Sequence, residues 1–322
     1  MKKLELVDFL RGWSISAIVL FHLCGMMDLP SIVKTASNFG GAGVHVFILC
    51  SGFGLYLSQM RKPLGFGDFI KKRLIRVHFP FMFIVIISFF VPFFSGSYNL
   101  EALFANLLFY KMFITEFNNA YGNQMWFVSM IVQFYLAFFL IVSFYSRRGG
   151  VKSVFISLVI SYTYAVVIVL IGKSELRVWN SFFLQYLWEF ILGMYFAEQY
   201  SKNPENIKIP RRGCLLMAIV IGMGLTGYMA MNGVWGKMFN DIPSLVGFMS
   251  VALFVYSFKN AAINKCFSYI NKFSYEWYLV HILAFTIVFH LCGNSIAMGC
   301  VAFILSYSCG IGFQKMISKI LK

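Results

Sequence analysis

The sequence is poor in charge, and above all in acidic residues. Asp and Glu together number 12 in 322 residues, charged residues make up only 12% of the chain, and proline occurs 7 times. A soluble domain carries about 25% charged residues, so this composition excludes an ordinary soluble globular protein. No polar stretch is long enough for a separate soluble domain, which predicts a single domain over residues 1–322.

Two further patterns are missing. The seven cysteines stand singly and none forms a C-x-x-C pair, so the sequence predicts neither a disulfide framework nor a metal site. A cleavable signal peptide is also not indicated, because Glu5, Asp8 and Arg11 interrupt its would-be apolar core and no small-x-small site follows. We therefore expect the first apolar segment to be retained.

Long apolar runs dominate the remainder, since 60% of the residues are hydrophobic. Runs of roughly the 20 residues needed to cross a bilayer predict an all-α polytopic membrane helix bundle of about ten transmembrane helices. The runs at 42 and 242 are short or rich in glycine and are the least secure. The predicted spans are 7–27, 42–60, 77–96, 125–146, 153–172, 181–200, 213–231, 242–258, 274–292 and 296–314.

The basic residues predict the orientation of these spans. An even number of spans places both termini on one side, and the connections on the opposite side carry few of the 27 Lys and Arg residues. The positive-inside rule then predicts cytoplasmic termini in a multi-pass protein of the plasma or inner membrane. The net charge of +15 is thereby explained by topology and lipid contact, not by nucleic acid. The opposite connections hold Lys34, Lys111, Lys173, Arg177 and Lys237.

The first apolar run contains two ionisable residues, Arg11 and His22. Eleven positions are about three helical turns, which places both side chains on one face about 16 Å apart. Ionisable residues inside a span are costly and are functional candidates by default. A cation near water and an imidazole deeper in the apolar layer suit an anionic ligand whose reactive end reaches inward. The alternative is an Arg11 that extends to the headgroups and a His22 that only packs.

The most basic connection precedes the third run. Arg73 and Arg76 are three residues apart and therefore share a helix face beside Lys71 and Lys72. Paired guanidinium groups are well suited to phosphates. The alternative is ordinary charge on the cytoplasmic side of the membrane.

Three more ionisable residues lie within apolar runs. Glu189 lies near the middle of its run and needs a proton or a partner, for which Arg11 or a histidine would serve. His281 lies in the ninth run, more than one helical turn deeper than Glu276. His45 opens the glycine-rich second run, where a hydrogen-bonded structural histidine is the favoured interpretation. A shared site would require Arg11, His22, Glu189 and His281 to face one another.

The connection 97–124 is not plainly polar. Residues 100–117 have helical periodicity, which predicts either an interfacial helix or lid over a cavity, or a packing helix without a functional role.

These motifs, in this order, resemble acyltransferase family 3, a family of membrane acyltransferases. The resemblance covers nearly the whole chain. One departure is His45, where many members carry Asp. The matching elements are Arg11-x10-His22; Gly43-Val44-His45-Val46-Phe47 with Ser51-Gly52-Phe53; Arg73-x-x-Arg76 followed by Pro80; Trp126-Phe-x-Ser129; and Ser274-Tyr275-x-x-Tyr278-Leu279-Val280-His281.

The resemblance implies an acyl-CoA-dependent O-acetyltransferase. Such a protein would move an acetyl group from cytoplasmic acetyl-CoA to a hydroxyl of a surface polysaccharide or lipid-linked sugar. Arg11, Arg73 and Arg76 would then bind the donor, while His22, Arg11, Glu189 and His281 would form the catalytic group. The expected partners are acetyl-CoA, a carbohydrate acceptor, the bilayer and a second copy in a homo-oligomer. The competing interpretations are a polytopic transporter or flippase, and a membrane sensor without catalysis.

Overall fold

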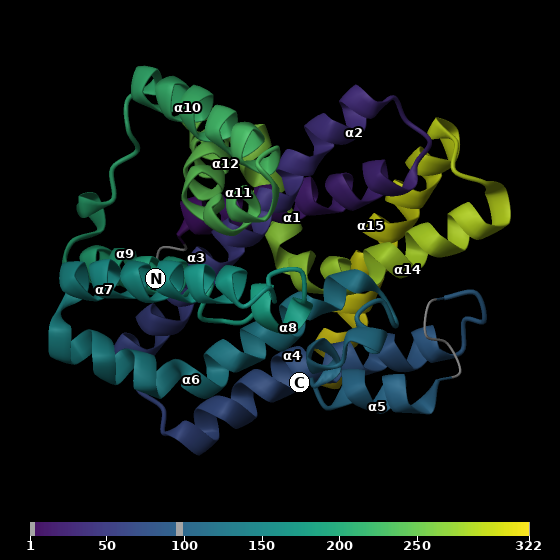
Figure 1. Cartoon of the computed structure of the whole chain (residues 1–322), viewed down its shortest axis with the longest axis horizontal. Coiled ribbons are helices and arrows are strands. Elements are labelled where there is room, and N and C mark those ends of the chain that lie inside the picture. The colour runs from purple at the N-terminus through teal and green to yellow at the C-terminus, as the bar shows by residue number, and fades with distance from the viewer. Residues whose placement is uncertain (1–3, 95–98, 322) are drawn as a thin grey trace.

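The computed structural model describes residues 4–94 and 99–321, and every regular element in them is a helix (Figure 1). The all-α prediction is therefore confirmed. The α-helices are α1 (Glu5–Met26), α2 (Ser31–Ser37), α3 (Gly43–Arg61), α4 (Phe66–Phe89), α5 (Leu100–Leu107), α6 (Trp126–Arg148), α7 (Gly150–Leu170), α8 (Arg177–Asn180), α9 (Leu187–Lys202), α10 (Arg212–Ala230), α11 (Gly233–Phe239), α12 (Asp241–Tyr256), α13 (Ala261–Ile270), α14 (Ser274–Cys292) and α15 (Ile296–Ile320).

Short 3₁₀ turns connect several of these helices. They span Asn38–Ala42, Lys111–Phe113, Thr115–Phe117, Asn123–Met125, Pro204–Asn206 and Asn271–Phe273.

The described residues contain fewer candidate membrane spans than the sequence predicts. Seven helical segments are long and apolar enough to cross a bilayer. The pair α11 and α12, bent by 55°, provides an eighth if it counts as one span. The prediction of about ten spans is therefore not confirmed. The seven segments are Glu5–Met26, Ser31–Arg61, Asn123–Arg148, Gly150–Leu170, Arg212–Ala230, Ala261–Cys292 and Ile296–Ile320.

Two predicted spans, 77–96 and 181–200, fall short for different physical reasons. The first lies in α4, which begins at Phe66. The N-terminal half of this helix contains Lys71, Lys72, Arg73 and Arg76, which are too many charges for an apolar span. Residues 95–98 lie outside the described chain. The second is shortened because regular helix begins only at Leu187, and α9 has 16 residues. About 20 residues are needed to cross the apolar layer in a straight helix.

The helix α1 lies at the centre of the fold and contacts α2, α3, α12, α13 and α14. The neighbouring helices α3 and α9 approach each other closely through glycine. A Cβ on Gly52 would overlap the carbonyl oxygen of Phe190, and one on Gly193 would overlap that of Leu49. Small residues at a helix interface permit this backbone approach in a membrane. The glycine-rich second run is thus explained by packing.

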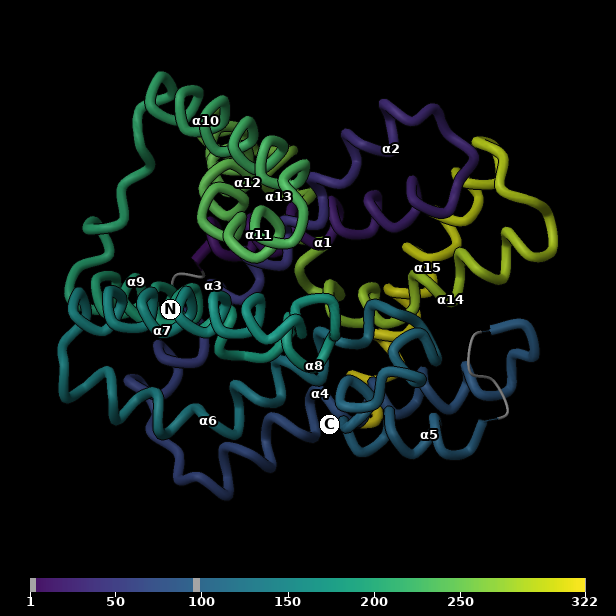
Figure 2. The backbone as a smooth tube through the Cα atoms, in the orientation of Figure 1, coloured from purple at the N-terminus to yellow at the C-terminus, as the bar shows by residue number. Residues whose placement is uncertain are grey.

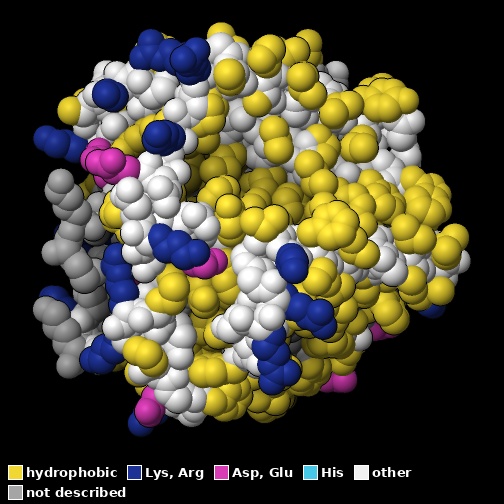
Figure 3. Space-filling model, turned by 90° about the vertical axis from the view of Figure 1, so that its left-hand side faces the viewer, with side chains coloured by type: hydrophobic (Ala, Val, Ile, Leu, Met, Phe, Trp, Pro, Cys, Tyr) yellow, Lys and Arg dark blue, Asp and Glu magenta, His cyan; other side chains and the backbone are white. Residues whose placement is uncertain are grey.

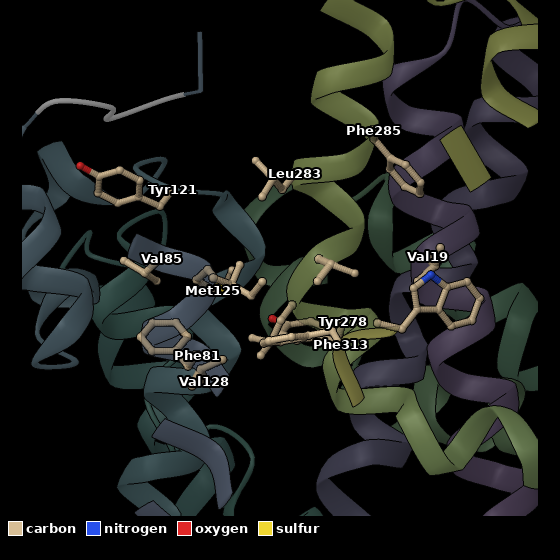
Figure 4. Close-up of a cluster of buried hydrophobic side chains, with 14 of the residues drawn as sticks. Val19, Phe81, Val85, Tyr121, Met125, Val128, Tyr278, Leu283, Phe285 and Phe313 are labelled. Carbon is tan, nitrogen blue, oxygen red and sulfur yellow. The ribbon is translucent and has the colours of Figure 1, made fainter. Parts of the chain in front are cut away.

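Buried apolar side chains form the cores on both sides of α1. In Figure 4, Val19 of α1 faces Phe285 of α14, and Tyr278 and Phe313 lie between this group and Phe81 of α4. Residues just before α6, including Tyr121 and Met125, belong to the same cluster. The connection between α5 and α6 is therefore packed into the core.

The connections are distributed between two ends of the bundle. The α6–α7 turn and the long α9–α10 connection lie at the left of Figures 1 and 2. The α14–α15 turn, α2 and α5 lie at the right. Figure 3 looks onto the left-hand end, where Lys and Arg side chains are spread over the surface beside broad hydrophobic flanks.

Candidate active site

The helices α1 and α14 meet through two histidines. The Nδ1 of His22 lies 2.9 Å from the Nε2 of His281, and the two rings stack with centroids 5.1 Å apart. His281 is fully buried, whereas His22 is partly exposed. The structure thus brings together two of the residues that the sequence singled out, from positions 259 residues apart.

The hydrogen bonds of His281 fix which nitrogen of each neutral ring carries the proton. The Nδ1 of His281 lies 2.7 Å from the carbonyl oxygen of Tyr278, and a carbonyl can only accept. The Nδ1 therefore donates, and the Nε2 of His281 accepts a hydrogen bond from the Nδ1 of His22. The lone pair of His22 consequently lies on Nε2. This is the arrangement in which a positioned imidazole serves as a base or a nucleophile.

Arg11 lies three helical turns before His22 on α1, beside Phe47 of α3. Its guanidinium lies 5.9 Å from the centroid of the Phe47 ring and within electrostatic range of Glu276. Its Nε is buried and has no hydrogen-bond partner among the described residues. A buried guanidinium N–H without a partner is costly, and a bound anion would satisfy it.

Arg73 and Arg76 approach the same region from α4. Tyr135 of α6 lies within electrostatic range of Arg11, Arg73 and Arg76 together. The guanidinium of Arg73 lies 5.4 Å from the centroid of the Phe69 ring, and its Nε is also buried without a partner in the described chain. Three cations from two helices thus face a common region. Such a cluster is suited to a ligand with several negative charges.

Glu189 lies in a different place from the one a shared site would require. Its Oε1 lies 2.7 Å from the Nδ1 of His45, and its side chain has no exposed surface. Nearby, the Nε2 of Gln185 donates to the Oδ2 of Asp241 over 2.7 Å. The structure therefore joins Glu189 to α3 and not to Arg11 or His22. The catalytic role of Glu189 remains a prediction.

The connection 97–124 contains only a short helix in its described part. The helix α5 ends at Leu107, and Phe109 has a φ of 63°, which is left-handed and incompatible with a continuing helix. The expected helix over residues 100–117 is thus wrong beyond Leu107. The ring of Phe109 instead packs on His78, with centroids 4.5 Å apart.

The same connection holds residues that sequence analysis did not assign to the site. Lys111 is 2% exposed and donates from Nζ to the carbonyl oxygens of Ala120 and Gly122, over 2.6 and 2.7 Å. The next turn carries Gln124, whose carbonyl accepts a hydrogen bond from the Tyr278 hydroxyl. Tyr278 is the residue whose own carbonyl orients His281. The only sequence signal for this link is an isolated lysine in an otherwise apolar segment.

Burial also changes the acidity of Lys111, which lies outside the membrane-spanning segments. Loss of hydration, with repulsion from Arg177 adding to it, lowers the pKa of Lys111 to about 7. A neutral amine retains two N–H donors, which matches the two carbonyl acceptors beside it.

Together, the fold and these residues define a polytopic all-helical membrane protein with a histidine pair inside its bundle and a group of arginines, of which Arg11 and Arg73 are half-buried and Arg76 is exposed. The chain belongs to acyltransferase family 3, since the model of this acyltransferase domain matches residues 5–314, nearly the whole chain. Comparison with the curated proteins and with the solved structures gave no match. The resemblance noted from the sequence is thus confirmed. Membership supports acyl transfer as the activity and does not favour a transporter or flippase.

Proposed function

We propose that the protein is a membrane O-acetyltransferase that moves an acetyl group from cytoplasmic acetyl-CoA to a hydroxyl of a surface polysaccharide or a lipid-linked sugar. The observation that carries this proposal is the bonded series from the Tyr278 carbonyl through His281 to His22, which leaves the Nε2 of His22 free to react. The proposal places both termini in the cytoplasm and the protein in the plasma or inner membrane.

The donor end of the proposed site is the arginine cluster. Coenzyme A carries several phosphate charges, and Arg73 and Arg76 lie in the N-terminal half of α4, after Lys71 and Lys72. Arg11 lies deeper, and it would contact the donor between this arginine pair and His22. By helical rise, Arg11 and His22 are about 16 Å apart along α1, so an extended thioester arm would span the distance.

Two chemical routes use the free nitrogen of His22. In the first, Nε2 accepts the proton of the acceptor hydroxyl while its oxygen attacks the thioester carbonyl. The C–S bond breaks, and the thiolate of coenzyme A takes up that proton. In the second, Nε2 itself attacks the carbonyl and the thiolate leaves. The acyl-imidazole then passes the acetyl group to the hydroxyl oxygen, and the hydroxyl proton ends on the thiolate of coenzyme A. Only the second route exchanges labelled coenzyme A into acetyl-CoA without an acceptor.

The test of this function is acetyl transfer by a His22→Ala variant at equal protein amount. General base catalysis contributes about 10²- to 10⁴-fold, so transfer should fall at least 10²-fold. The matched control is His290→Ala on α14, because His290 stacks on Phe93 and lies away from the histidine pair. Transfer near the parental rate in His22→Ala would overturn the assignment.

The donor site has a separate test. The double variant Arg73→Ala with Arg76→Ala should weaken binding of acetyl-CoA at least tenfold, because hydrogen bonds to charged groups contribute about 1.5–3 kcal/mol each. The control is Arg147→Ala with Arg148→Ala, which removes two charges from the end of α6. Equal binding by both double variants, measured by calorimetry in detergent, would contradict the proposed phosphate site.

A further inference from the structure

A pocket of about 570 Å³ lies at the start of α1, outside the candidate active site. Its walls come from the first turn of α1, the end of the α9–α10 connection, the start of α10, the end of α12 and the start of α13. Since α1 runs from Glu5 toward His22, the pocket and the histidine pair are about 25 Å apart along that helix. None of the residues that line it belongs to the proposed acyl-transfer site.

The charges around this pocket are mainly positive. Arg211, Arg212 and Lys259 line it, and Glu5 is the one acidic residue among its lining residues. Arg212 is held in place by hydrogen bonds of 3.1 and 3.0 Å to the hydroxyl and carbonyl of Ser257. Arg211 and Lys259 have no such restraint among the described residues. The net positive charge of the lining favours an anionic ligand.

The helix α10 adds to this field. Its 19 residues begin at Arg212, at the mouth of the pocket, and no side chain caps its first turn. An uncapped helix N-terminus carries a partial positive charge and free N–H donors. By contrast, α13 is already capped, because the side chain of Asn260 accepts from the N–H groups of Ala262 and Ile263.

An independent observation points to a ligand in the pocket. Asn264 lines it and is only 7% exposed, and its Oδ1 is buried with no hydrogen-bond partner in the described chain. A buried amide oxygen without a donor costs about 1–3 kcal/mol. A ligand that brings an O–H group next to its negative charge would satisfy Asn264 and the cations at once.

The surroundings indicate that this ligand is a lipid. Ile209, Pro210 and Tyr256 give the pocket an apolar side. Along α10, the side chains that follow the pocket are large, apolar and exposed, including Met217, Val220 and Ile221. A headgroup in the pocket would therefore place its acyl chains against the apolar face of α10. Basic pockets between helix ends on the cytoplasmic side bind anionic headgroups in this way.

We propose that this pocket binds the headgroup of an anionic phospholipid with free hydroxyls, the chemistry of phosphatidylglycerol. The phosphate lies between Arg211, Lys259 and the start of α10, and a glycerol hydroxyl donates to the Oδ1 of Asn264. The site holds lipid whether or not acetyl transfer takes place.

The experiment uses full-length protein in nanodiscs and measures its thermal stability and its retained lipid by native mass spectrometry. Dioleoyl phosphatidylglycerol should raise the melting temperature, and dioleoyl phosphatidylcholine should not. The double variant Arg211→Gln with Lys259→Gln should weaken retention of phosphatidylglycerol about thirtyfold, since each basic residue contributes about 1 kcal/mol near a membrane surface. Lys315→Gln with Lys319→Gln on α15 is the charge-matched control.

Two further measurements distinguish a lipid phosphate from a soluble phosphate compound and test the role of Asn264. Inorganic phosphate or coenzyme A alone should not stabilise the protein in phosphatidylcholine, and stabilisation by either would overturn the lipid assignment. Asn264→Leu should abolish the preference for phosphatidylglycerol over dioleoyl phosphatidic acid, which lacks the glycerol headgroup. Equal lipid retention by the parent and by Arg211→Gln with Lys259→Gln would refute the proposal.

Discussion

In the described chain, two pairs of side chains each join a histidine to a second ionisable residue across two helices, and they differ in partner and in exposure. The His22–His281 pair joins two imidazoles across α1 and α14, with His22 partly exposed. The His45–Glu189 pair joins an imidazole to a carboxylate across α3 and α9, where glycines bring the backbones together. One pair ends on a nitrogen free to react, and the other is an ion pair between closely packed helices.

This difference separates a pair suited to catalysis from a pair suited to stabilising the fold. Two neutral rings can be buried without separating charge, so the His22–His281 pair keeps a reactive lone pair at small cost. A buried ion pair must offset the desolvation of both charges, and it then fails sharply when one partner is removed. We therefore expect substitutions in the His45–Glu189 pair to affect folding and those in the His22–His281 pair to affect turnover.

The largest expected effect is on stability. Glu189→Ala leaves His45 buried without its acceptor, and removing one partner of a buried pair costs about 3–5 kcal/mol. The double variant His45→Phe with Glu189→Leu replaces both partners with apolar groups and should recover most of that loss. Thermal unfolding in detergent measures both. If Glu189→Ala unfolds at the parental temperature, the His45–Glu189 pair does not stabilise the fold.

The next effect is on the rate. His281→Leu removes the acceptor that holds the Nδ1–H of His22, so the free nitrogen is no longer fixed in place. Because mispositioning of a catalytic imidazole is costly, acetyl transfer should fall about 10²-fold in kcat with KM little changed. His281→Gln, whose amide oxygen can accept the same hydrogen bond, should restore part of the rate. Equal loss in both variants would reduce His281 to a packing residue.

The sequence predicted the features that depend on local periodicity. Arg11 and His22 lie three turns apart on one helix, as their spacing predicts, because a single helix fixes the relation between its own residues. The arrangement of Arg73 and Arg76 follows from the same rule. The all-α class follows from composition, since long apolar runs leave helices as the economical way to satisfy the backbone.

The sequence did not predict features that depend on tertiary pairing. Glu189 needed a partner, but no local rule selects His45 over Arg11 or His22 across 144 residues. The predicted number of membrane spans exceeds the number found in the described chain for two reasons. Charged residues extend into α4, and irregular backbone before α9 shortens that helix. The role of the α5–α6 connection was also hidden, because Lys111 and Gln124 act through backbone carbonyls that carry no sequence signal.

The smallest expected effect tests how the His22–His281 pair depends on that connection. Lys111 holds the carbonyls of Ala120 and Gly122, just before Gln124, which accepts the Tyr278 hydroxyl. In the unfolded chain the lysine binds its proton with a pKa near 10.5, whereas burial lowers the folded pKa to about 7. Between these values the unfolded state binds more protons, so stability should rise with pH by up to about 1.4 kcal/mol per unit.

Lys111→Met removes this titration and should flatten the dependence of the melting temperature on pH between pH 7 and 9. Lys173→Met, at an exposed lysine in the α7–α8 connection, should leave the slope as in the parent. The same Lys111→Met protein should lose part of its acetyl transfer, because the turn that supports Tyr278 is no longer held. An unchanged pH slope would mean that Lys111 is charged in the folded protein, and the connection would then support the histidine pair through an ammonium group.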